Sequence, residues 1–363
     1  MPPRNSADSG VLLDGVLNNT QVPHQSLCVI NDGTTFSGLP IFKDILRRAI
    51  RRGEEVTLIS ILHSPEDLLP SDTSSSSSAK IKVIDLSGSV QGYSTEEDIG
   101  TMKDKILSTY TSGQIFIDAL DILAEDYSSS AVLSLTRSIL NVIKKSKAPS
   151  RLILLLPPSS IIHSALIPPS FNSTITLLTP HQPSLVQHLS KSYLSPISIT
   201  PSPNLWMILE NATKRSISSD LAYKGEEGIE ADPNWLTNGG NAIIQVLVRK
   251  ATGGIKGISR SLEAAKCSTG DIDTRSELEV IELEDIINLN PITNPTNTIS
   301  PMENGDNKPI QNHSELDLPF NLSLTDDQRR KRAEVPLPYA HEGEGASGDL
   351  IWEDEEETDD EEI

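Results

Sequence analysis

The sequence predicts an α/β fold: a mostly parallel β-sheet with helices on both faces and an antiparallel extension at its C-terminal end. Short, almost continuously apolar runs indicate strands that are buried on both sides, and segments with helical spacing of apolar residues lie between several of them. After Pro157 the helical segments become scarce and strand-like runs follow one another. Alternation of strands and helices is typical of a parallel sheet, whereas consecutive strands favour antiparallel pairing.

The first half of the chain supplies the alternation. A short apolar strand over residues 26–31 leads through a turn into a helix over residues 40–52, and Pro40 suits the first turn of that helix. Two further helices are expected at residues 94–110 and 131–145, because apolar residues recur on one face of each. The remaining strands are predicted at residues 55–62, 80–86, 114–119 and 151–156.

The second half supplies the antiparallel extension. Its apolar runs are short, and few helical segments are expected between them. Strands are predicted at residues 174–178, 205–210, 242–249, 259–266 and 278–283.

The acidic residues are concentrated at the C-terminal end of the chain. The net charge is −21, but the last 31 residues hold 13 Asp and Glu and no Lys or Arg, which leaves −8 for residues 1–332. A run of like charges repels itself and stays solvated, so we expect one folded domain followed by polar segments. The predicted organisation is a disordered N-terminus (1–23), a folded domain (24–287) with a serine-rich loop (71–78), a polar linker (288–313), a partner-docking peptide (314–342) and an acidic tail (343–363).

The cellular setting follows from absences in the sequence. Cys28 and Cys267 provide neither a disulfide framework nor metal-ligand spacing, which favours a reducing compartment. No apolar segment has the length of a signal peptide or of a membrane span. We therefore expect a cytoplasmic and nuclear protein without membrane contact.

The turn after the first strand is where an α/β sheet would bind a nucleotide phosphate. A phosphate loop needs glycines, a lysine and a Ser or Thr, yet Gly-Lys-Ser/Thr occurs nowhere in the chain, and Asp32 puts a carboxylate where the phosphates would lie. Asp118 lies near the end of the strand predicted at residues 114–119, directly after three apolar residues. It could face a metal-bound nucleotide, but a helix cap or a solvent-facing loop carboxylate is the interpretation we favour.

No other catalytic pattern is present. The seven histidines lack metal-site spacing, and no Gly-x-Ser-x-Gly elbow accompanies the many serines. The sequence thus predicts no catalytic, cofactor-binding or metal-binding residue.

Two basic clusters are candidate contact sites. Arg47, Arg48, Arg51 and Arg52 lie on the polar side of the first long helix at i, i+3 and i+4 spacing, so they could contact RNA phosphate, a neighbouring subunit, or only solvent. The cluster over residues 329–332 could be a nuclear import signal, an RNA contact or a docking segment.

The peptide after the linker is suited to docking on a partner. It joins a short apolar motif, the basic cluster and a proline-rich stretch, and proline favours an extended conformation that loses little entropy on binding. Its candidate contact residues are Leu318, Phe320, Leu322, Arg329, Arg330, Arg332, Val335, Pro336, Leu337, Pro338 and Tyr339.

These features together resemble the fifth-subunit family of Elongator, the complex that modifies wobble uridines of transfer RNA. The terminal peptide, with Ile351, Trp352 and the acidic end, carries the most specific match. Weaker matches lie in order at residues 28–53, 55–62 and 115–120. The serine tract and the linker depart from the family pattern.

The resemblance implies a RecA-like domain that lacks Walker motifs. It further implies a hetero-hexameric ring with the fourth and sixth Elongator subunits, which binds tRNA, works with the catalytic subcomplex of the first to third subunits, and supports wobble uridine (U34) modification. No catalytic residue and no cofactor is carried over. Two alternatives stay open: a degenerate RecA-like ATPase and a free-standing RNA-binding protein.

Overall fold

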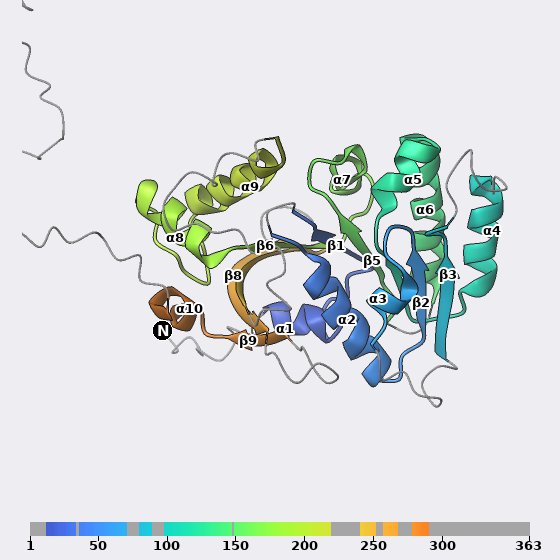
Figure 1. Cartoon of the computed structure of the whole chain (residues 1–363), viewed down its shortest axis with the longest axis horizontal. Coiled ribbons are helices and arrows are strands. Elements are labelled where there is room, and N and C mark those ends of the chain that lie inside the picture. Colours follow the sequence, from blue (N-terminus) through green and yellow to red (C-terminus); the bar gives the residue numbers. More distant parts are fainter. Residues whose placement is uncertain are drawn as a thin grey trace, which may run out of the picture. The chain divides into compact units, whose positions relative to one another are not determined.

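The computed structural model describes residues 12–33, 36–70, 80–88, 98–146, 149–218, 240–251, 257–267 and 278–289. These residues form a nine-stranded sheet in the order β3-β2-β4-β5-β1-β6-β7-β8-β9 (Figure 1). The strands are β1 (Leu27–Asn31), β2 (Val56–Ser60), β3 (Ile81–Asp85), β4 (Gln114–Ile117), β5 (Leu152–Leu156), β6 (Ile175–His181), β7 (Asn241–Arg249), β8 (Ile258–Cys267) and β9 (Leu278–Ile281).

The helices alternate with the strands through most of the chain. They are α1 (Leu12–Leu17), α2 (Leu39–Arg51), α3 (Pro65–Leu68), α4 (Ile99–Thr109), α5 (Leu120–Asp126), α6 (Ser129–Lys145), α7 (Ile161–Leu166), α8 (Pro183–Ser192), α9 (Pro203–Ser218) and α10 (Leu283–Leu289). The predicted strands of the first half and its three predicted helices are all confirmed, with ends that differ by a few residues.

The strand pairing confirms the predicted change from parallel to antiparallel strands along the sheet. β1 to β6 pair in parallel, and β7, β8 and β9 follow in antiparallel register. All five residues of β1, β2 and β5 are buried, as expected for strands with helices on both faces. The short connections of an antiparallel meander need no covering helix between β7 and β9, which explains the change of pattern.

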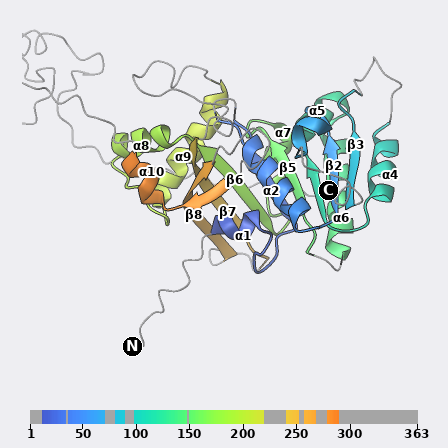
Figure 2. The same cartoon turned by 60° about the horizontal axis from the view of Figure 1, so that its bottom comes forward.

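Three apolar clusters form the core. On one face α1, α2 and α3 pack around Phe42 and Phe116, whose rings meet edge to face with centroids 5.5 Å apart. On the other face α4 to α7 cover the strands from β3 to β6. The helices α8, α9 and α10 cover β7 and β8, and Figure 2 shows them grouped at that end of the sheet.

The prediction of a disordered N-terminus over residues 1–23 is wrong for residues 12–23. Leu13, Val16 and Leu17 of α1 are fully buried against α2 and β7, and burial of such side chains contributes roughly 1.5–3 kcal/mol each. The buried Glu263 on β8 accepts hydrogen bonds from the backbone N–H groups of Leu12 and Leu13, both at 2.9 Å. A six-residue helix is too short to be stable alone, so only these tertiary contacts maintain it.

Two further predictions are corrected in the second half. Residues 205–210 belong to α9 and not to a strand, because Leu205, Leu209 and Ala212 recur at helical spacing and pack together on the core. Helices are also more frequent than predicted after Pro157, since α7, α8 and α9 all precede β7. The serine-rich loop at 71–78 and most of the 288–313 linker lie outside the described residues, but Asn288 and Leu289 complete α10.

Candidate functional site

The loop after β1 lies at the carboxyl end of the parallel strands, where α/β sheets bind nucleotides. Asp32 Oδ1 accepts hydrogen bonds from Ser37 Oγ at 2.7 Å and from the backbone N–H of Gly38 at 2.9 Å. Gly38 is the N-cap of α2, so the chain's own carboxylate satisfies an amide at this helix N-terminus. An incoming phosphate would have to displace that carboxylate against its negative charge.

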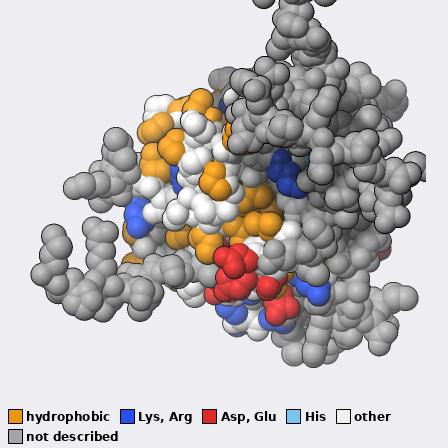
Figure 3. Space-filling view, turned by 90° about the vertical axis from the view of Figure 1, so that its left-hand side faces the viewer, with side chains coloured by type: hydrophobic (Ala, Val, Ile, Leu, Met, Phe, Trp, Pro, Cys, Tyr) orange, Lys and Arg blue, Asp and Glu red, His pale blue; other side chains and the backbone are white. Residues whose placement is uncertain are grey.

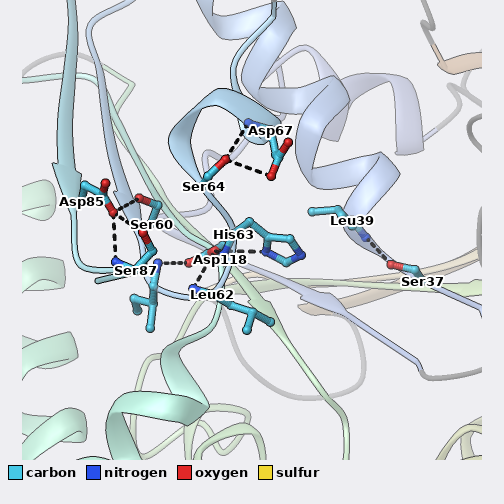
Figure 4. A network of polar contacts seen from close by, with 11 residues as sticks. Ser37, Leu39, Ser60, Leu62, His63, Ser64, Asp67, Asp85, Ser87 and Asp118 are labelled. Atoms are coloured by element: carbon cyan, nitrogen blue, oxygen red, sulfur yellow. Dashed lines mark hydrogen bonds and ion pairs between the residues drawn. The ribbon is translucent and has the colours of Figure 1, made fainter. Parts of the chain in front are cut away.

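The same loop is packed closely against the strand that precedes it. A Cβ atom at Gly38 would lie 2.3 Å from the carbonyl oxygen of Asn31, which only glycine avoids. Leu39 donates its backbone N–H to Ser37 Oγ at 3.1 Å, a further bond within the loop (Figure 4). Asp32, Ser37 and Gly38 thus form a closed turn.

Asp118 is the second candidate on this edge, and the structure corrects its predicted solvent exposure. Its side chain is fully buried and lies at the end of β4. The carboxylate accepts hydrogen bonds from the backbone N–H groups of Ile61 at 2.6 Å, Leu62 at 3.1 Å and His63 at 2.8 Å, and the Nδ1 atom of His63 lies 3.1 Å away. Asp118 therefore fixes the chain that leaves β2 (Figure 4).

The neighbouring polar side chains also form hydrogen bonds with residues close to them in the sequence. Asp85 at the end of β3 accepts hydrogen bonds from the backbone and side chain of Ser87, and these bonds hold its pKa below the usual value. Ser64 caps α3 through Asp67 (Figure 4). The groups at this edge bond one another rather than converging on a shared vacant position.

The four arginines of α2 do not act alike. Arg48 is largely buried and bonds Asp44 Oδ2 at 2.7 Å, Asn18 Oδ1 at 3.0 Å and the carbonyl oxygen of Leu278 at 2.6 Å. It therefore joins α1, α2 and β9.

The other three lie nearer the solvent. Arg52 is exposed and pairs with Glu54 at 2.6 Å. Arg47 is half-buried and Arg51 exposed, and each has a polar or electrostatic contact as well. Only Arg47, Arg51 and Arg52 are placed to contribute to an external contact.

We expect Arg48→Ala to lower the free energy of unfolding by about 3 kcal/mol. Asp44 is fully buried and would lose its ion-pair partner, which is the costly way to break such a pair. Arg51→Ala, a matched change one turn away on the same helix, should cost less than about 0.5 kcal/mol. Urea denaturation measures both. Equal stability of the two variants would contradict a structural role for Arg48.

Sequence reasoning missed Arg151, which begins the strand predicted at residues 151–156. It is among the largest fully buried side chains, and it donates to the carbonyl oxygen of Val16 at 2.6 Å and to Gln114 Oε1 at 2.8 Å. Burial lowers its pKa to about 10. A charged residue before an apolar run is usually exposed, so the sequence carried no signal for this contact between α1, β4 and β5.

The other predicted contact residues lie outside the described residues. They are Leu318, Phe320, Leu322, Arg329, Arg330, Arg332, Val335, Pro336, Leu337, Pro338 and Tyr339.

Within the described part of the chain, no three His, Cys, Asp or Glu side chains are grouped so that they could hold a metal ion. Both cysteines are buried, and neither takes part in a disulfide with another described residue. No helix in the same ranges has the length and apolar character needed to cross a bilayer.

The strand order and the helices on both faces define a mostly parallel α/β domain, in which Asp32 bonds the amide at the start of α2 and the sequence contains no Gly-Lys-Ser/Thr. The chain matches the family model described as Elongator subunit Iki1 over residues 12–353, and it belongs to that family. The matched range includes both the fold and the terminal peptide.

No curated protein matches the chain. Among solved structures, the KaiC-like protein PH0186 from the hyperthermophilic archaeon Pyrococcus horikoshii OT3 is similar at 12% identity, with 71% of this chain and 90% of that chain covered and a TM-score of 0.39.

Proposed function

We propose that this chain is a non-catalytic subunit of Elongator that forms a hetero-hexameric RecA-like ring with the fourth and sixth subunits. The ring binds tRNA and, together with the catalytic subcomplex of the first to third subunits, supports modification of the wobble uridine U34. The family match over residues 12–353 is the observation that carries the proposal. We place its activity in the cytoplasm and the nucleus.

The two carboxylates at the sheet edge support a non-catalytic role. In a phosphoryl-transfer site, backbone amides and a strand-end aspartate would face the phosphates and the metal ion. Here Asp32 bonds the amide at the start of α2, and Asp118 bonds three backbone amides of the chain after β2. Binding a nucleotide would cost these bonds before any new bond formed.

The terminal peptide supplies the adhesion that the proposal requires. Leu318, Phe320 and Leu322 alternate with polar or proline residues, and Val335 to Tyr339 contain two prolines. Short extended peptides of this kind bind grooves and sheet edges of partners at low entropic cost. We assign Val335, Leu337 and Tyr339 to contact with a neighbouring subunit.

Truncation tests whether the docking peptide (residues 314–342) binds the neighbouring subunits. A tagged chain that ends at Ser314 should recover at least about tenfold less of the fourth and sixth subunits than the full chain, because it lacks the whole docking peptide. A chain that ends at Glu342 removes only the acidic tail and should recover both subunits normally. Quantitative co-purification is the measurement. Equal recovery with the two truncations would show that the docking peptide does not bind the neighbouring subunits.

The alternative functions predict different results for the isolated chain. Magnesium-dependent ATP affinity that is lost in Asp118→Ala would favour a degenerate RecA-like ATPase. Tight RNA binding by the lone chain, falling steeply with salt and weakened by loss of Arg47 and Arg51, would favour a free-standing RNA-binding protein. RNA binding by the assembled ring alone would support the proposed subunit.

A further inference from the structure

Several basic side chains lie at one edge of the parallel sheet, the edge where its strands begin. They come from the end of α2, which leads into β2, from the start of β3, and from the last turn of α6, which leads into β5. Because parallel strands begin at the same edge of a sheet, these segments share one side of the domain. We call the following residues the basic edge: Arg51, Arg52, Lys80, Lys82, Lys144 and Lys145.

Hydrogen bonds between the loops join the first part of the basic edge into one surface. Lys80 Nζ donates to the carbonyl oxygen of Gly53 at 2.7 Å, which places it beside the end of α2. Lys82 Nζ donates to the carbonyl oxygen of Thr109 at 2.7 Å and to Thr111 Oγ1 at 2.9 Å. The start of β3 thus lies between the end of α2 and the end of α4.

The same surface continues to the end of α6. The backbone N–H of Gly113 donates to Ser150 Oγ at 3.1 Å, and Ser150 Oγ donates to Ser146 Oγ at 3.1 Å, directly after Lys145. In the strand order β3-β2-β4-β5, neighbouring strands lie about 4.8 Å apart, so the basic edge is about 15 Å wide from β3 to β5.

The contacts within the basic edge position its cations but cancel little of their charge. Lys80 and Lys82 donate to carbonyl and hydroxyl oxygens, which are neutral. The described carboxylates of these loops are Glu54, which pairs with Arg52 at 2.6 Å, and Glu55. Cations therefore outnumber carboxylates in the described part of these loops, and the basic edge presents a net positive charge.

Other surfaces of the domain differ in charge from the basic edge. Asp32, Asp85 and Asp118 lie at the ends of β1, β3 and β4, on the opposite edge of the sheet. Figure 3 views the end formed by α8, α9 and α10, where hydrophobic and acidic side chains gather. Since the whole chain has a net charge of −21, a polyanion would be attracted to the basic edge and repelled by most of the remaining surface.

The side chains of the basic edge suit the backbone of an RNA duplex better than unpaired bases. Unpaired bases are bound by stacking on exposed aromatic rings, whereas Tyr110, the one aromatic residue in the described part of these loops, is buried. Lysine, arginine and the hydroxyl groups of Thr111 and Ser112 are donors that phosphate and ribose oxygens accept. Such contacts recognise the shape of an A-form helix and not its base sequence.

We propose that the basic edge binds the phosphate backbone of a double-helical arm of the RNA. This role of the basic edge rests on the proposed function, because the RNA is the tRNA that the assembled ring binds. It adds which side of this subunit meets the RNA and which part of the RNA is bound. The loop after β1, at the opposite edge of the sheet, then faces away from the bound duplex.

Fluorescence anisotropy with the ring assembled from the full chain and the fourth and sixth subunits tests the basic edge. The probes are an RNA duplex of about 16 base pairs and a single strand of the same length. Lys144→Gln/Lys145→Gln should weaken duplex binding at least about tenfold. It should also reduce the slope of log K against log salt concentration by about 2, roughly one for each lost phosphate contact. The matched control is Lys191→Gln/Lys266→Gln, which removes the same charge from exposed lysines of α8 and β8 and should change neither value.

The possible results separate this inference from the proposed function. Equal effects of the two double variants, in a ring that binds the duplex, would overturn the role of the basic edge and leave the proposed function standing. Tighter binding of the single strand than of the duplex would overturn the assignment to a double-helical arm. Loss of co-elution with the fourth and sixth subunits in Lys144→Gln/Lys145→Gln would make the edge a protein contact and also overturn it. If the parent ring bound neither RNA, the proposed function itself would fail, and this inference with it.

Discussion

Replacing Asp118 by alanine is expected to lower the free energy of unfolding by about 3 to 5 kcal/mol. The carboxylate is fully buried and accepts hydrogen bonds from three consecutive backbone N–H groups, those of Ile61, Leu62 and His63. Alanine would leave these donors without a partner, and each unpaired buried donor costs about 1 to 3 kcal/mol. Chemical denaturation of the full chain measures the loss.

Asp85→Ala provides the matched control for Asp118→Ala. Asp85 ends the neighbouring strand β3 and also bonds local donors, but it is exposed, so its removal should cost less than about 1 kcal/mol. If Asp118→Ala instead kept the stability of the parent and abolished magnesium-dependent ATP binding, Asp118 would be a ligand and the non-catalytic assignment would be wrong.

Lowering the pH from 7 to 5 is expected to destabilise the fold by about 4 kcal/mol through two buried histidines. Burial lowers the pKa of His163 and of His181 to about 4 each. In the unfolded chain both would titrate near 6.5. As the pH falls, the unfolded state therefore binds protons before the folded state does. The contribution of the histidines to the free energy of unfolding is fully present above pH 6.5 and is lost as the pH falls toward 4. By pH 5 the loss is about 2 kcal/mol per histidine.

His163 lies in α7 and His181 at the end of β6, and both bond side chains of the sheet. His163 Nε2 lies 2.7 Å from Asn31 Oδ1, and Asn31 in turn donates to Thr179 Oγ1 at 2.7 Å, which links α7, β1 and β6. His181 Nε2 lies 3.0 Å from Gln245 Oε1 across the β6–β7 pair. Protonation would put a charge inside each of these buried contacts.

Equilibrium unfolding at several pH values, in the parent and in His163→Gln/His181→Gln, measures the effect. The double variant should have a lower stability at pH 7 but a much flatter dependence on pH. Burial and Arg151 also lower the pKa of His24, which adds a smaller change of the same sign. Burial raises the pKa values of Asp44 and Glu263, and these shifts act in the opposite sense. An unchanged slope in the double variant would show that other groups control the transition.

The sequence predicted the parallel half of the sheet because burial on both faces leaves a simple pattern. The five residues of β1 and of β5 are all apolar except Asn31, and few other structures require such runs. The helices α2, α4 and α6 were recognised for a similar reason, since their apolar residues repeat on one face. These are local signals, and local signals are what a single sequence records.

The candidate site was predicted only in part. The missing lysine and the presence of Asp32 predict a loop that does not bind phosphate, but the bonds from Ser37 and Gly38 to Asp32 were not foreseen. The position of Asp118 in a buried network was not foreseen, because its partners lie just after β2, more than fifty residues earlier in the chain. Arg48 looked equivalent to Arg51 on the helix, but it faces α1 and β9.

The sequence by itself determined the α/β class, the positions of most strands along the chain, the absence of a Gly-Lys-Ser/Thr motif and the concentration of acidic residues near the C-terminal end. Each of these depends on residues that are close together in the chain. Only the tertiary structure decided that α1 is a helix, that residues 203–218 are helical, and that Arg48, Asp118, Arg151 and Glu263 serve the interior. The physical reason is that a buried polar group is stable only beside partners that distant segments supply, and no local pattern encodes where those partners will be.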